Sequence, residues 1–123
     1  GYELAPRYPS DLVTLTSHFD EKVTVTTEAR VLDVDGDDSI DIRYNGPKAS
    51  HIVVRIFDLQ GRSVATLYDG WCLGPQRATW DGRDDAGRKV PPGVYVCHVQ
   101  ARPRAGGELV EDAAPIVVGM KLE

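Results

Sequence analysis

Apolar and polar residues alternate along most of this chain, with the period of two that β-strands require. The clearest case is the segment 51–59, HIVVRIFDL, in which Val54 and Ile56 share one face of a strand while Arg55 and Phe57 share the other. No segment shows the 3.6-residue period of a long amphipathic helix. The pattern therefore predicts an all-β protein.

Turn-forming residues divide this alternation into short strands. The segment 22–34 is long for one strand and is expected to bend or divide, with Val23, Val25, Thr27, Ala29 and Val31 on one face. Strands are expected at 12–16, 22–34, 39–44, 51–59, 63–68, 76–80, 93–101, 108–110 and 115–120. Roughly seven to nine strands with turns between them predict an antiparallel β-sandwich, and a small barrel is the alternative.

The composition is that of one folded domain. The chain has 123 residues, of which 41% are hydrophobic and 27% charged, enough for a single core. Its formal net charge of −5 argues against a nucleic-acid partner, because phosphate binding depends on clustered lysines and arginines. The apolar runs are too short for a membrane span. We expect an N-terminal arm or extra strand over residues 1–28 and the sandwich over 29–123.

The two cysteines, Cys72 and Cys97, do not lie in a CxxC pair, so their spacing gives no indication of a zinc site. An even number of cysteines permits one disulfide between them. The alternative is that Cys97 is a small core residue of a strand and Cys72 a loop thiol. The sequence leaves both interpretations open, because it does not supply the Cα distance that a bridge needs.

Three blocks in the second half of the chain are distinctive: IFDLQGR at 56–62, WDGRDDAG at 80–87 and VPPGVY at 90–95. In this order and spacing they closely resemble the immunoglobulin-like domain of the flagellar hook-capping protein. The same module occurs near the C-termini of many large secreted bacterial proteins, and it is similar to tails used in type IX secretion. The resemblance implies an immunoglobulin-like β-sandwich and an extracellular or cell-surface location.

Elementary turn and core chemistry accounts for these blocks. Aspartate carboxylates accept backbone N–H bonds in tight turns, and glycine adopts the positive φ that such turns require. The ring of Trp80 is expected between the sheets, and Tyr95 is expected to face inward with its hydroxyl near the rim. The residues expected in structural roles are Asp58, Gly61, Trp80, Asp81, Gly82, Asp84, Gly87, Gly93 and Tyr95.

An acidic segment, DVDGDDSID at 33–41, suggests a cation site. Alternating carboxylates in a glycine-containing loop can converge on calcium, which takes six to eight oxygen ligands. The segment is not an EF-hand, since Asp38 and Tyr44 stand where Gly and Glu would be needed. The candidate calcium ligands are Asp33, Asp35, Asp37 and Asp41, and a second candidate group is Asp81, Asp84 and Asp85. The alternative is a solvated acidic turn. No other cofactor is expected.

No catalytic motif is visible: the chain lacks a nucleophile elbow, an HExxH, a P-loop and a GxGxxG. The histidines, His18, His51 and His98, are far apart and are expected to be surface residues and not ligands. The sequence therefore indicates a protein that is not an enzyme.

Three functions fit these observations. The preferred one is an accessory or interaction module of a larger secreted or cell-surface protein, for which the resemblance implies spacing, anchoring, secretion or docking to the parent chain or secretion machinery. The second is a self-assembling subunit of an extracellular filament, in which an N-terminal segment such as 11–16 adds a strand to an identical neighbour. The third is a carbohydrate-binding module that stacks sugars on Trp71, Tyr68 and Tyr44.

Overall fold

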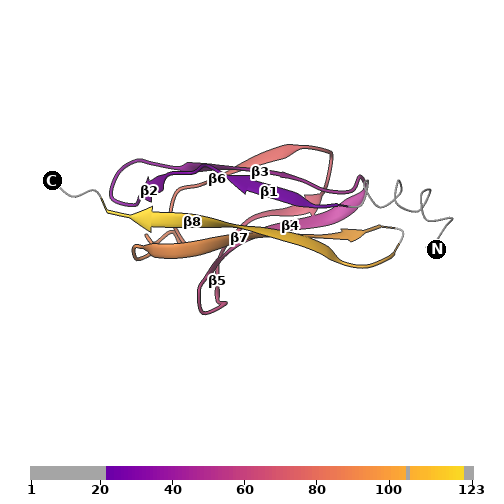
Figure 1. Ribbon diagram of the computed structural model, residues 1–123. Helices are drawn as coiled ribbons and strands as arrows, with labels where there is room; N and C mark the ends of the chain where they lie inside the picture. Colours follow the sequence, from indigo (N-terminus) through magenta and orange to yellow (C-terminus); the bar gives the residue numbers. More distant parts are fainter. Residues whose placement is uncertain (1–21, 105, 121–123) are drawn as a thin grey trace, which may run out of the picture.

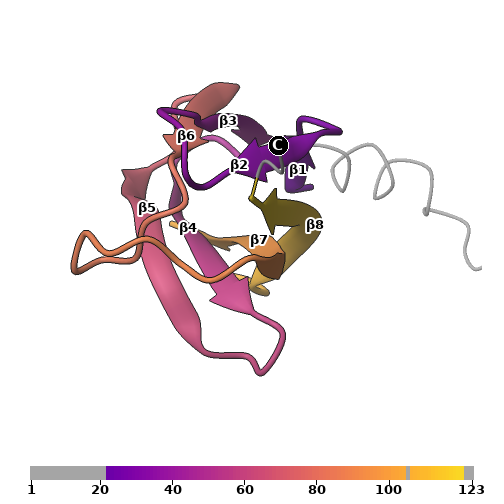
Figure 2. The ribbon, with the colours of Figure 1, turned by 90° about the vertical axis from the view of Figure 1, so that its left-hand side faces the viewer.

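The computed structural model describes residues 22–104 and 106–120, which form eight β-strands in two facing sheets (Figures 1 and 2). The strands are β1 (Thr24–Thr27), β2 (Val31–Asp33), β3 (Ile40–Asn45), β4 (Ser50–Asp58), β5 (Ser63–Trp71), β6 (Gln76–Trp80), β7 (Gly93–Pro103) and β8 (Val110–Gly119). The prediction of an all-β protein is confirmed. The strand expected at 12–16 and His18 lie outside the described residues, and the domain boundary at 28 stays a prediction.

The strands pair into a three-stranded sheet, in the order β1-β3-β6, and a five-stranded sheet, in the order β2-β8-β7-β4-β5. Two stacked sheets make an immunoglobulin-like sandwich, as predicted, in place of the alternative barrel. One pairing departs from the antiparallel expectation, because β2 runs parallel to β8, with Val31 beside Val117 and Asp33 beside Gly119. No helix in the described part of the chain has the length and apolar character needed to cross a membrane.

The long segment 22–34 divides as expected, between Thr27 and Val31. Glu28 and Arg30 stabilise the connection between β1 and β2. The Glu28 carboxylate accepts a bond from the backbone N–H of Asp41 at 3.0 Å, and the Arg30 guanidinium donates to Asp38 at 2.8 Å. The chain thereby moves from the three-stranded sheet to the five-stranded sheet. The expectation that these residues share one face is therefore wrong: Val23 and Val25 are buried, whereas Ala29 and Val31 are exposed.

Two strands are longer than expected. β5 continues through Asp69-Gly70 to Trp71, because the missing side chain of Gly70 admits the Tyr68 hydroxyl, which would lie 2.9 Å from a Cβ there and donates to the Trp71 carbonyl at 2.7 Å. β8 is one uninterrupted strand that includes Pro115. β2 pairs with β8 only at residues 117–119. Pro115 therefore lies in a part of β8 that has no strand paired to it on the β2 side, where the missing N–H of proline costs no ladder hydrogen bond.

The core lies between the sheets and is built from alternate residues of the strands that face each other. Trp80 is 2% exposed and lies edge-on to Tyr95, with ring centroids 5.5 Å apart. The largest fully buried side chains are Trp80, Leu32, Ile40, Ile42, Ile52, Ile56, Ile116, Val54 and Val99. This core fixes the two ends of the sandwich: the loops 34–39, 59–62 and 81–92 lie at one end, and the loops 46–49 and 72–75 at the other.

Candidate functional site

The turn residues of the three sequence blocks close the loops at one end of the sandwich. The Asp58 carboxylate accepts bonds from the backbone N–H groups of Gln60 (3.0 Å) and Arg62 (2.9 Å), and Gly61 between them has φ of 83°. Asp84 repeats this arrangement by accepting from the N–H groups of Ala86 and Arg88. These carboxylates are therefore committed to the backbone.

The remaining block residues hold the same loops. Trp80 Nε1 donates to the carbonyl of Arg83 at 2.9 Å, and the Asp81 carboxylate accepts from the backbone N–H of Arg83 at 3.2 Å. The Tyr95 hydroxyl donates to the carbonyl of Pro91 at 2.6 Å, at the rim of the core. Three glycines of these blocks, Gly82, Gly87 and Gly93, have φ values of 79°, 83° and 158°. The hydrogen bonds of Trp80, Asp81 and Tyr95 all end on the backbone of the loop 81–92.

The acidic segment 33–41 forms a turn in which its carboxylates bind the protein itself. Asp33 accepts from the backbone N–H of Asp35 at 3.1 Å, and Asp38 accepts from Arg30 and from the N–H groups of Asp33 and Ser39. The Arg30 guanidinium is the main reason why the pKa of Asp38 lies below its ordinary value. The segment therefore behaves locally as a hydrogen-bonded acidic turn.

The four candidate calcium ligands do not gather at one point among the described residues. Asp41 lies in β3 with its carboxylate 3.7 Å from Arg77, apart from Asp33 and from the exposed Asp35 and Asp37. Within residues 22–104 and 106–120, no group of three or more histidine, cysteine or acidic side chains could hold a metal ion. The same holds for Asp81, Asp84 and Asp85, since Asp85 accepts from the N–H of Thr66.

Acid should weaken this loop end. Bonds from the backbone N–H groups of Arg62 and Arg88 lower the pKa of Asp58 and the pKa of Asp84 respectively below the ordinary value of an aspartate. A carboxyl whose folded-state pKa is lowered stabilises the protein above its unfolded-state pKa, and this contribution disappears as pH falls through the folded-state value. We expect the melting temperature to be flat above about pH 5 and to fall below about pH 4.

A melting series from pH 7 to pH 2 tests this expectation. Asp84→Asn should lower the melting temperature at pH 7 and flatten its decline in acid. Asp37→Asn is the matched control, because its carboxylate accepts no hydrogen bond from the described residues. A steep acid decline that Asp84→Asn leaves unchanged would contradict the assignment.

Both cysteines are free and buried, so the disulfide that the sequence permitted is not formed. Cys97 lies in the middle of β7 as a core residue, and burial raises the pKa of its thiol to about 12. Cys72 follows β5, with its sulfur 3.5 Å from the carbonyl of Gly46. The second interpretation of the sequence, a core residue and a loop thiol, describes these positions.

The aromatic residues considered for sugar stacking do not form a platform. Tyr44 is buried and the Tyr68 hydroxyl is bonded to the carbonyl of Trp71, which leaves Trp71, 53% exposed, as the accessible ring of the three. The His51 ring packs edge-on against Trp71, with centroids 5.8 Å apart, and the guanidinium of Arg104 lies 5.9 Å from the Trp71 ring centroid. This corner has the composition of a protein contact, in which Trp and Arg are enriched.

The two described histidines form surface pairs with carboxylates. His51 Nε2 lies 2.6 Å from Asp69, and His98 Nε2 lies 2.6 Å from Glu111. No third metal-ligating side chain joins either pair in the described ranges. Both are cross-strand contacts of the outer face of the five-stranded sheet.

An apolar row that the sequence did not reveal crosses this outer face. Val31, Val117 and Val94 are direct neighbours on β2, β8 and β7, and they are 54%, 44% and 42% exposed. We call them the valine row. Pro115 and Val96 form the adjacent pair on β8 and β7. The alternation of each strand marks one of its faces as apolar, but only the register between strands places these three side chains together.

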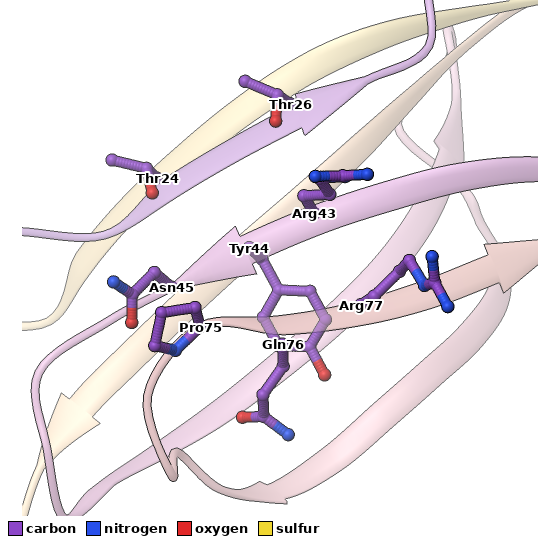
Figure 3. A pocket seen from close by; sticks show the side chains of 8 residues that line it. All are labelled: Thr24, Thr26, Arg43, Tyr44, Asn45, Pro75, Gln76 and Arg77. Atoms are coloured by element: carbon purple, nitrogen blue, oxygen red, sulfur yellow. The ribbon is translucent and has the colours of Figure 1, made fainter.

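A shallow hollow of about 410 Å³ lies on the opposite side, on the outer face of the three-stranded sheet. Figure 3 shows its side chains, with Thr24 and Thr26 on β1, Arg43 on β3 and Arg77 on β6. Arg43 and Arg77 are directly opposed across the two strands. Polar and cationic side chains at an open surface of this kind can recognise an anionic partner.

Comparison with known proteins agrees with this architecture. FlgD from P. aeruginosa is similar with a TM-score of 0.52 and 24% identity, over 76% of this chain and 74% of that one. A crystal structure of dimeric latent PorU from Porphyromonas gingivalis is similar with a TM-score of 0.58 and 18% identity, over 80% of this chain and 10% of PorU. At these identities the likeness shows the fold. No curated protein matches the chain.

A family model gives the assignment. The model of the FlgD Ig-like domain matches residues 26–104, which contain all three sequence blocks, the end of β1 and the six strands from β2 to β7. The resemblance seen in the sequence is thereby confirmed. Since the match extends over more than half of the 123 residues, the chain belongs to the FlgD Ig-like domain family.

Proposed function

We propose that this chain is a non-catalytic accessory module of a larger bacterial protein, secreted or held at the cell surface, that docks onto a protein surface. The observation that carries the proposal is the valine row. Three apolar side chains in register lie exposed on a sheet whose alternate residues, Leu32, Ile116 and Val118, are fully used in the core. Contiguous exposed apolar surface of this kind is typical of interaction sites.

Two further observations support the proposal. The FlgD-like Ig domain is a non-enzymatic fold, which agrees with the sequence analysis. The chain spans only a tenth of PorU, as expected of one module in a larger protein. Docking through a sheet face suits such a module, because the register fixes the side chains before binding and little conformational entropy is lost.

Photo-crosslinking tests the docking face. A photo-reactive residue in place of Val117, in the protein that naturally carries this domain, should form specific adducts with a neighbouring domain or a surface protein. The same residue in place of the exposed Asp37, at the loop end, is the control and should give few adducts. Equal crosslinking at the two positions would contradict the proposal.

Light scattering tests the competing functions. We expect the isolated chain to remain a 13.5 kDa monomer at all concentrations, with or without residues 1–16 and with or without calcium. A mass that rises with concentration, and that falls back to the monomer when residues 1–16 are removed, would instead indicate a self-assembling subunit. Retention on polysaccharide that is lost in Trp71→Ala would instead indicate sugar binding.

A further inference from the structure

Four strands lie at the edges of the two sheets, and in the described part of the chain two of them are covered by specific contacts and a third is short. On β1, the backbone N–H of Val25 donates to the Asp112 carboxylate at 3.0 Å. On β5, the N–H of Thr66 donates to Asp85 at 3.1 Å, and the N–H of Asp85 donates to the carbonyl of Val64 at 3.1 Å. β2 is only three residues long. Edges that are short or covered in this way resist pairing with other chains.

Residues 22–104 and 106–120 leave the fourth edge strand, β6, open. In an antiparallel pair, residues alternate between bonding their partner and facing away. The N–H of Val25 donates to Asp112 and therefore faces away from β3, so Val25 and Tyr44 are not a hydrogen-bonded pair. The backbone groups of Tyr44, and those of Ile42 two residues before it, consequently face β6 and bond to it. On β6 the N–H and C=O groups of Arg77 and Thr79 therefore point outward. No strand of the described chain pairs with them there (Figure 2).

Two arginines lie side by side on the outer face next to the open edge. Arg77, with 62% of its side chain exposed, has its nearest carboxylate at Asp41, 3.7 Å away. Arg43 lies directly opposite Arg77 on β3 and forms no ion pair with any described residue (Figure 3). Like charges placed opposite each other on neighbouring strands are destabilising, and a carboxylate brought beside them would remove this cost.

Space for an added strand exists beside this edge. A hollow of about 370 Å³ lies between β6 and β5. It is lined by Ala65, Leu67 and Thr79 and, in the loop 81–92, by Arg83 and the carboxylates of Asp81, Asp84 and Asp85. The side chains of an added strand alternate between its two faces. One set would lie beside Arg77 and Arg43 on the outer face, where it could carry carboxylates. The other set would enter the hollow over Ala65 and Leu67 and would be uncharged, because the aspartates of the hollow repel further carboxylates.

We propose that the free edge of β6 receives an extended acidic segment of a partner protein as an added strand. This inference rests on the proposed function, because it specifies one kind of protein that the module binds. Main-chain bonds to Arg77 and Thr79 provide affinity, and carboxylates of the partner beside Arg77 and Arg43 provide selectivity. A second copy of β6 is a poor occupant, because pairing would bring the arginines of both chains onto one face.

Titration of the full chain with short peptides tests the proposal. The probe is a peptide in which valine and glutamate alternate, and its control carries lysine in place of glutamate. The acidic peptide should bind, the basic one should not, and binding should slow hydrogen exchange at the N–H groups of Arg77 and Thr79. Arg77→Glu should weaken binding at least about tenfold, since it places like charges together.

Two variants complete the design. Thr79→Pro removes an outward N–H without breaking the pairing with β3 and should abolish binding. Arg102→Glu makes the same charge change on the five-stranded sheet and should leave the affinity unchanged. Equal binding of both peptides, wild-type affinity in Arg77→Glu, or dimers of the chain itself that Thr79→Pro removes would each overturn the proposal.

The results also separate this inference from the proposed function. If neither peptide binds while Val117 still crosslinks to a protein neighbour, the edge assignment fails and the docking module stands. If Val117 does not crosslink and the chain self-assembles, the proposed function fails first.

Discussion

Replacing Trp80 with alanine is expected to lower the free energy of unfolding by about 3–5 kcal/mol. Trp80 is the largest fully buried side chain and packs edge-on against Tyr95. Its indole N–H also holds the carbonyl of Arg83, at the start of the loop that contains Asp84. The substitution removes core volume and a loop contact together, so it should leave a cavity in the core and destabilise the loop 81–92.

Thermal melting measures this loss, and the melting temperature should fall by more than about 10 °C. Trp71→Ala is the matched control: it deletes the same side chain at a position that is 53% exposed, and it should cost less than about 1 kcal/mol. Equal losses for the two variants would show that the Trp80 ring does not fill the core.

Leu32→Ala is the second change with a large expected effect, about 2–5 kcal/mol. Leu32 is fully buried although it belongs to the shortest strand, β2. Its Cδ2 atom would lie 3.4 Å from a Cβ placed on Gly82, so the side chain packs directly beneath the loop that follows Trp80. A cavity there should loosen both β2 and this loop.

The neighbouring residue provides the control. Val31→Ala alters the same three-residue strand on its exposed face and should change stability by no more than about 0.5 kcal/mol. Denaturant titration of the two variants separates burial from strand propensity. If Val31→Ala costs as much as Leu32→Ala, β2 is stabilised by its backbone pairing and not by its buried side chain.

Local patterns in the sequence were sufficient to predict most of the strands and turns of this fold. Alternation identified the strands around Ile56 and Tyr95, and turn chemistry identified Asp58 and Gly61, because each of these signals lies within a few neighbouring residues. The parallel pairing of β2 with β8 was not predictable in this way. It depends on contacts between residues about 86 positions apart, such as Val31 and Val117, for which local periodicity carries no information.

The candidate surfaces were harder to predict for the same reason. The valine row and the opposed pair of Arg43 and Arg77 exist only through strand register. The local geometry of the acidic turn was not predictable either: Asp33 and Asp38 turn their carboxylates toward backbone N–H groups, and the calcium hypothesis stays a prediction. Carboxylates in a polar loop have two competing uses, and the order of residues does not distinguish them.

The loops at the two ends of the sandwich divide the chain into a fixed part and an adaptable part. The end that carries Asp58 and Asp84 is committed to closing its own turns. The opposite end displays Leu73, 83% exposed, beside Trp71, and these side chains contribute little to the core. Exposed positions there can change at small cost in folding free energy, so the same scaffold can evolve new partners without losing its architecture.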